Sequence, residues 1–134
     1  MPSFTTINLM EIDNALADRV EGIEGRFTRS RIDSRDLGVS RFTYAANMRS
    51  PMAHSHREQE EAYVVIAGSG KALLDDEVID LHLWDVLRVA PEVVRAFEGG
   101  PDGLDMIAVG GPRPEDGDGV IAPASWPDGA SGEQ

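Results

Sequence analysis

Two histidines and a glutamate are the residues of this chain whose types and spacing best fit metal chemistry. His54 and His56 are two of only three histidines in the sequence, and they lie two residues apart. Side chains with this spacing on an extended strand point to the same face. Glu61 follows five residues after His56 and begins an apolar run typical of a further strand. Because imidazole nitrogens and carboxylate oxygens bind divalent transition metals, the spacing predicts a pocket with three ligands.

The segments that must position these side chains are short and alternate between apolar and polar residues. We expect strands at residues 26–32, 39–46, 61–67, 71–74, 78–83, 85–89, 94–97 and 104–109. Turn residues, mostly Gly, Pro and Asp, separate them at 33–36, 68–70, 75–77 and 99–103. No helical crossover separates the strands, which favours antiparallel pairing. The pattern predicts an all-β sandwich or barrel.

The two ends of the chain differ from this central part. Apolar residues near helical spacing over residues 7–20 predict a short helix, so residues 1–25 are interpreted as an N-terminal extension with a short helical segment. Residues 26–110 form the predicted barrel. Residues 111–134 form a tail rich in Pro, Gly and Asp, interpreted as a surface strap or a partly disordered segment. Trp126 is its large apolar anchor, and we expect it to dock on the barrel.

The length, net charge and composition of the chain limit the classes of function that it can have. A length of 134 residues fits one domain, and the net charge of -12 argues against nucleic acid as a partner. The absence of cysteine excludes disulfides and thiolate metal sites. We also find no signal-peptide pattern and no apolar stretch of about 20 residues, so we expect a cytoplasmic protein without membrane contact.

The spacing around the histidines resembles the first motif of the cupin superfamily. His54-x-His56, four residues, Glu61, six residues and Gly68 follow that motif, while Met48 stands where the family has its leading Gly. The resemblance implies a jelly-roll cupin barrel with a site inside its mouth, and often a homodimer. It does not imply one reaction, because this fold hosts many.

The second cupin motif is degenerate here. Asp85 and Pro91 are kept, but Trp84 replaces the family's Gly, and Gly99 replaces its later Asn. Trp84 is interpreted either as a cover for the barrel mouth or as part of a dimer interface. Most important, Arg95 stands where the family has its fourth ligand, a His.

Arg95 leaves three alternatives open, because a guanidinium stays protonated and cannot bind a metal. In the first alternative it pairs with Glu61 and leaves a metal-free pocket. In the second it flanks a three-ligand ion and binds the carboxylate or phosphate of a substrate. In the third alternative it turns to solvent.

Two further residues are candidates for substrate binding. Tyr63 shares the strand face of Glu61, so its phenol is placed either to hydrogen-bond a substrate or to fill the barrel. Gln59 has the same alternation and reaches the same site if its loop bends.

Two function classes follow from these residues. A centre of His54, His56 and Glu61 with open positions suits Fe, Mn, Ni or Zn, and predicts a metal-dependent enzyme acting on a small anionic substrate. Its reaction stays undefined among isomerisation, decarboxylation and oxygenation, and no catalytic residue is identified. The alternative is a metal-free cupin that serves as a small-molecule binding or sensing module.

Overall fold

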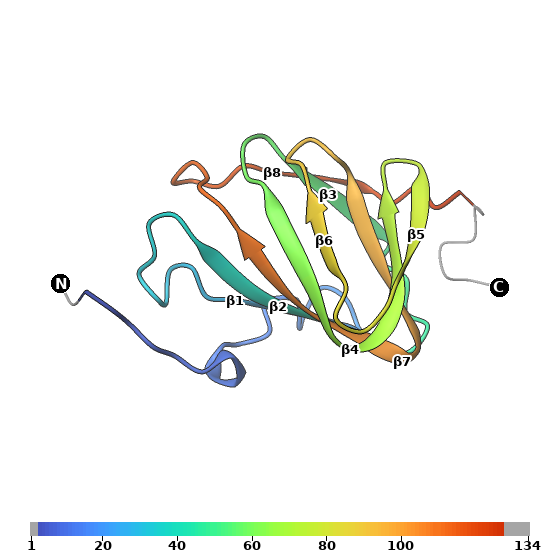
Figure 1. Cartoon of the computed structure of the whole chain (residues 1–134), viewed down its shortest axis with the longest axis horizontal. Coiled ribbons are helices and arrows are strands. Elements are labelled where there is room, and N and C mark those ends of the chain that lie inside the picture. Colours follow the sequence, from blue (N-terminus) through green and yellow to red (C-terminus); the bar gives the residue numbers. More distant parts are fainter. Residues whose placement is uncertain (1–2, 128–134) are drawn as a thin grey trace.

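The computed structural model of the chain describes residues 3–127, and antiparallel strands make up most of the regular structure there (Figure 1). The strands are β1 (Ile23–Phe27), β2 (Gly38–Tyr44), β3 (Met52–His56), β4 (Glu61–Leu74), β5 (Glu77–Leu81), β6 (Val86–Val89), β7 (Arg95–Gly110) and β8 (Gly119–Pro123). This confirms the predicted all-β fold.

Two long strands organise the sheet. β4 and β7 pair with each other along nearly their whole length, and the shorter strands flank them at either end. At one end the strand order is β1-β2-β7-β4-β6, and at the other end it is β8-β3-β7-β4-β5. The sheet curls through the shared strands, as Figure 1 shows, and so produces the expected jelly roll.

The sequence predicts turns at residues 68–70 and 99–103, and this prediction is wrong. Both segments lie inside continuous strands, β4 and β7, where the register shifts between Val65 and Ala67 and again between Gly68 and Gly70. Gly68 has a φ of 73°, and a Cβ there would clash with the carbonyl oxygen of Gly103. The glycines therefore let two paired strands bend together instead of ending a hairpin.

The predicted helix over residues 7–20 is mostly absent. Only the short 3-10 helix η1 (Leu9–Glu11) forms, and residues 15–19 form turns. The side chain of Asn14 explains the difference, because its Oδ1 accepts hydrogen bonds from the backbone N–H groups of Leu16 and Gly25. These bonds tie the segment to β1 in place of a helical ladder.

The tail contributes strand β8, which sequence analysis did not predict. β8 pairs with β3 along its whole length, from Met52 opposite Pro123 to His56 opposite Gly119. Trp126 follows β8, and its docking is confirmed: it is buried against Ala53, and its indole N–H donates to the carbonyl of Ser50 at 3.1 Å. Residues 128–134 of the tail lie outside the described residues.

The core fills the space between the two ends of the curled sheet. Its fully buried members include Tyr63 and Val65, which share the β4 face of Glu61 as predicted, together with Leu104 and Met106 of β7. Within residues 3–127, no helix is long and apolar enough to cross a bilayer.

Trp84 occupies the turn between β5 and β6. Its φ of 71° lies in the left-handed region that favours glycine, the residue expected there from the cupin motif. The side chain is 67% exposed and is not among those lining the interior cavity. Trp84 therefore does not cover the barrel mouth, and its place in a dimer interface stays a prediction.

Candidate metal centre

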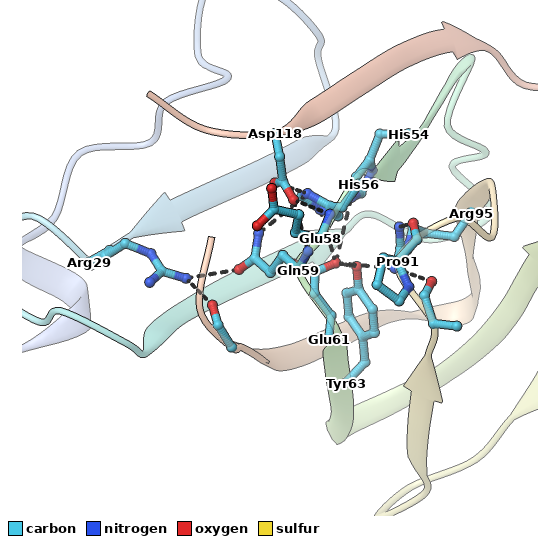
Figure 2. Close-up of polar contacts among 12 residues, drawn as sticks. Arg29, His54, His56, Glu58, Gln59, Glu61, Tyr63, Pro91, Arg95 and Asp118 are labelled. Carbon is cyan, nitrogen blue, oxygen red and sulfur yellow. Dashed lines mark hydrogen bonds and ion pairs between the residues drawn. The ribbon is translucent and has the colours of Figure 1, made fainter. Parts of the chain in front are cut away.

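The structure brings the three predicted ligands together (Figure 2). His54 and His56 lie on β3, and Glu61 is the first residue of β4, so two different strands of the curled sheet supply the three side chains. The Nε2 atoms of His54 and His56 lie 3.7 Å and 3.4 Å from Oε1 of Glu61, and one ligand atom of each residue falls within 4.8 Å of the others. Atoms bound to one ion at 2.0–2.2 Å are about 3.0–3.5 Å apart. The cluster therefore needs little movement to surround a metal ion.

Asp118 fixes the orientation of His56. Its Oδ1 lies 2.8 Å from Nδ1 of His56, while its Oδ2 accepts the backbone N–H groups of Glu58 at 2.7 Å and Gln59 at 2.8 Å. Burial alone would raise the pKa of Asp118, but these three partners lower it to about 2. A carboxylate at Nδ1 holds the proton there and turns Nε2 toward Glu61 as a free ligand.

His56 is consequently held between two carboxylates. Burial would lower the pKa of its imidazole, but Glu61 and Asp118 together raise it. Nε2 of His56 is buried and makes no hydrogen bond within the described residues. A buried ring nitrogen that makes no hydrogen bond is an uncommon and unfavourable arrangement, which a bound cation would remove.

Glu61 is ionised and crowded on one oxygen. The hydroxyl of the buried Tyr63 donates to Oε1 at 2.5 Å, and both histidines approach the same atom. Burial would raise the pKa of Glu61, yet contacts from His54, His56 and Tyr63 lower it well below its usual range. Burial and the charge of Glu61 raise the pKa of Tyr63 well above its ordinary value, so the phenol stays a donor.

Arg95 is fully buried beside the cluster, so the alternative in which it turns to solvent is wrong. It begins β7 directly opposite His54, and its Nη2 lies 3.8 Å from Oε1 of Glu61. Long hydrogen bonds of 3.3 and 3.5 Å join its Nη atoms to the carbonyls of Ala90 and Pro91, and its Nε has no partner among the described residues. The guanidinium thus keeps unused donor capacity close to the three ligands.

Gln59 is buried on the opposite side of the cluster. Its Nε2 lies 3.3 Å from Nδ1 of His56, and its Oε1 accepts a hydrogen bond from Nη2 of Arg29 at 2.9 Å. Figure 2 shows Arg29 and Arg95 on opposite sides of the histidines. Gln59 therefore links the centre to a second arginine.

An interior cavity of about 660 Å³ opens onto the centre, a size that suits a small-molecule ligand. His54, His56, Glu61, Gln59 and Arg95 line it. Tyr63 does not line the cavity; it is buried in the core, and its hydroxyl donates to Glu61, while a contact with a ligand stays a prediction.

Sequence reasoning missed two residues of this site, Asp118 and Arg29. Asp118 lies in the Gly- and Asp-rich tail, where nothing in the sequence separates it from Asp116. The β3–β8 pairing places it beside His56, and no local pattern encodes that pairing. Arg29 lies just after β1. The sequence pattern there is equally compatible with an exposed polar residue, so it does not identify Arg29 as part of a site.

No family model matches the sequence, and no curated protein is significantly similar to it. Solved structures do resemble it. A cupin protein from Bacteroides fragilis is 21% identical with a TM-score of 0.68, over 86% of this chain and 89% of that chain. Pac13, a nucleoside dehydratase from Streptomyces, is 15% identical with a TM-score of 0.72, over 92% of this chain and 95% of that chain.

A third similar structure is the polyketide cyclase RemF from Streptomyces resistomycificus. It is 12% identical with a TM-score of 0.70, over 91% of this chain and 86% of that chain. A variant of Pac13 is solved with uridine. At these identities the likeness establishes a shared fold, and the proteins named differ in activity.

Proposed function

We propose that this protein, which has the cupin fold, binds one divalent transition-metal ion through His54, His56 and Glu61 and accepts a small anionic ligand beside it. One observation carries the proposal: Nε2 of His56 is buried and without a hydrogen bond, 3.4 Å from a carboxylate oxygen. Asp118 holds the other ring nitrogen, so the free atom is the one that faces the cluster.

The types of ligand limit which metal ions suit the site. Two imidazoles and one carboxylate with open positions suit Fe, Mn, Ni or Zn. A bound ion of this kind supplies Lewis-acid activation of a carbonyl or water, and iron adds dioxygen chemistry. The residues of the chain orient the ligand and exclude water around it, but they do not select one reaction.

Arg95 supports the anionic ligand. A divalent ion and a guanidinium at close range repel each other by several kcal/mol at an effective dielectric near 20. A carboxylate or phosphate between them relieves that repulsion and uses the free Nε of Arg95. The uridine bound to a Pac13 variant and the names of the other structures accord with a cavity for small molecules, but do not identify this ligand.

A specific observation also favours the metal-free alternative. Oε1 of Glu61 already receives the Tyr63 hydroxyl and lies 3.8 Å from Arg95, so its negative charge is partly balanced without an ion. In that case the cavity serves a small-molecule binding or sensing module. A homodimer and a cytoplasmic location stay predictions in both cases.

Metal analysis of protein purified without a histidine tag separates the two functions. We expect about one equivalent of metal after incubation with Fe, Mn, Ni or Zn, and its loss in the H54A/H56A double variant, because two of three ligands are removed. The exposed His82 gives the matched control, since H82A removes an imidazole outside the site. Protein that retains none of these four metals after reloading would contradict the metal centre and leave the binding module.

A further inference from the structure

The cavity wall carries an unusual concentration of positive charge for this protein. The chain has 24 acidic and 12 basic residues, yet the cavity is lined by four arginines and only two carboxylates. These residues are Arg19, Arg29, Arg95, Arg113, Glu61 and Asp118. Both carboxylates are already engaged by His56. A cavity lined by more positive than negative groups in an otherwise acidic molecule favours negatively charged ligands.

Arg29 is held in place and still has a free donor. Its Nη2 donates at 2.9 Å to both the carbonyl of Gly111 and Oε1 of Gln59, whereas its Nη1 is buried without a partner in the described chain. Two glycines opposite each other on β2 and β7 make room for this arrangement. A Cβ on Gly38 would approach Nη2 of Arg29 to 2.8 Å, and one on Gly110 would clash with Gln59.

Arg113 lies close enough to Arg29 for their charges to repel. Burial lowers the pKa of Arg29, and the charge of Arg113 lowers it further, while the charges of Asp118, Asp36 and Glu61 offset part of this decrease. Across residues 3–127, no carboxylate lies within 4.0 Å of either guanidinium. Two guanidinium groups without an ion pair line this part of the cavity, and one of them, Arg29, has a buried Nη1 without a partner, an arrangement that an oxyanion between them would relieve.

We infer that Arg29 and Arg113 form an anion-binding subsite, separate from Arg95, that holds a carboxylate or phosphate group of the ligand. The apolar side chains of Leu16, Val20, Phe27 and Phe42 line the same cavity and accept the body of the ligand. The ligand is therefore an amphipathic anion, with its charged group at Arg29 and Arg113. The assignment of its other end to the metal centre rests on the proposed function.

The test is calorimetric titration of the full-length, metal-free protein with three probes of similar shape: phenyl phosphate, phenylacetate and benzyl alcohol. We expect at least one anion to bind at least tenfold more tightly than benzyl alcohol, because only the anions pair with the guanidinium groups. The tighter of the two anions identifies the group as phosphate or carboxylate. R113Q should weaken its binding by about tenfold or more, as should R29Q.

Arg35 gives the matched control, because its side chain is 91% exposed and does not line the cavity, so R35Q should remove the same charge without effect on anion binding. R113Q carries the test if R29Q disturbs folding through the lost bonds to Gly111 and Gln59. Unchanged affinity in R113Q, equal binding of benzyl alcohol, or no binding of any probe would overturn the inference. A loss in R95Q but not in R113Q would place the anion beside the histidines and also overturn it.

Metal content measured in the same proteins separates this inference from the proposed metal centre. R113Q should retain as much metal as the wild type, because Arg113 contacts none of the three ligands. If the wild type binds no metal but R113Q still weakens anion binding, the metal centre is wrong and the subsite stands. If metal binds normally but R113Q leaves anion binding unchanged, the metal centre stands and the anion-binding subsite is wrong.

Discussion

The two ring nitrogens of His56 face two regions of different origin. Nε2 faces Glu61, which follows His56 by five residues and belongs to one local motif. Nδ1 faces Asp118, which lies 62 residues away and reaches the site through the β3–β8 pairing. The first region supplies the atoms that would bind a metal, and the second fixes how they point. The comparison indicates that the proposed metal centre depends on a remote carboxylate for its geometry as well as on its local ligands for its donor atoms.

The largest expected effect on metal affinity follows from removing the charge of Asp118 while the local ligands stay unchanged. D118N keeps the shape of the side chain but removes the charge that holds the proton on Nδ1 of His56. We expect metal affinity to fall by about 10- to 100-fold, as is typical when the carboxylate behind a ligating histidine is lost. Competition with a chromogenic chelator measures the change.

Asp116 provides the matched control, because it is exposed and lies two residues before Asp118 in the same tail. D116N should leave metal affinity within about twofold of the wild type, since an exposed charge is screened by solvent. Equal affinities in D118N and D116N would show that the local motif suffices and that the contact with Asp118 only stabilises the turn at residues 57–60.

This contrast also explains which features the sequence predicts. The all-β class and the convergence of His54, His56 and Glu61 follow from alternation and spacing within short segments. The bends in β4 and β7 do not, because glycines such as Gly68 are equally compatible with a tight turn. Asp118 and Arg29 depend on pairings between distant segments, and a single sequence carries no record of those pairings.

Substitutions of Arg95 test the local region, which contains the three proposed ligands. R95H places an imidazole where a guanidinium now lies beside Glu61, so it removes a repelling charge and adds a ligand type. We expect metal affinity to rise by about tenfold or more. R95M removes only the charge and should give a smaller increase. An unchanged affinity in both variants would mean that Arg95 does not face the ion.

The smallest expected effect is a pH dependence of the metal-free protein. The folded structure raises the pKa of His56, so its contribution to stability is complete below the unfolded value of about 6.5 and is lost as the pH rises through the folded value. Asp118 acts in the opposite direction. Its folded pKa of about 2 lies below the unfolded value, so its contribution is present above about pH 4 and is lost as the pH falls toward 2.

Urea unfolding of the metal-free protein at roughly pH 5.5, 7 and 8.5, a series that spans the histidine pKa of about 6.5, measures this effect. We expect the free energy of unfolding to decrease across the series in the wild type and to decrease less in D118N, which lacks the partner that raises the pKa of His56. Saturating metal should remove the decrease, because an ion requires the neutral imidazole and competes with its proton. A decrease that persists unchanged with metal would place the titrating group elsewhere, and His56 would then not be a ligand.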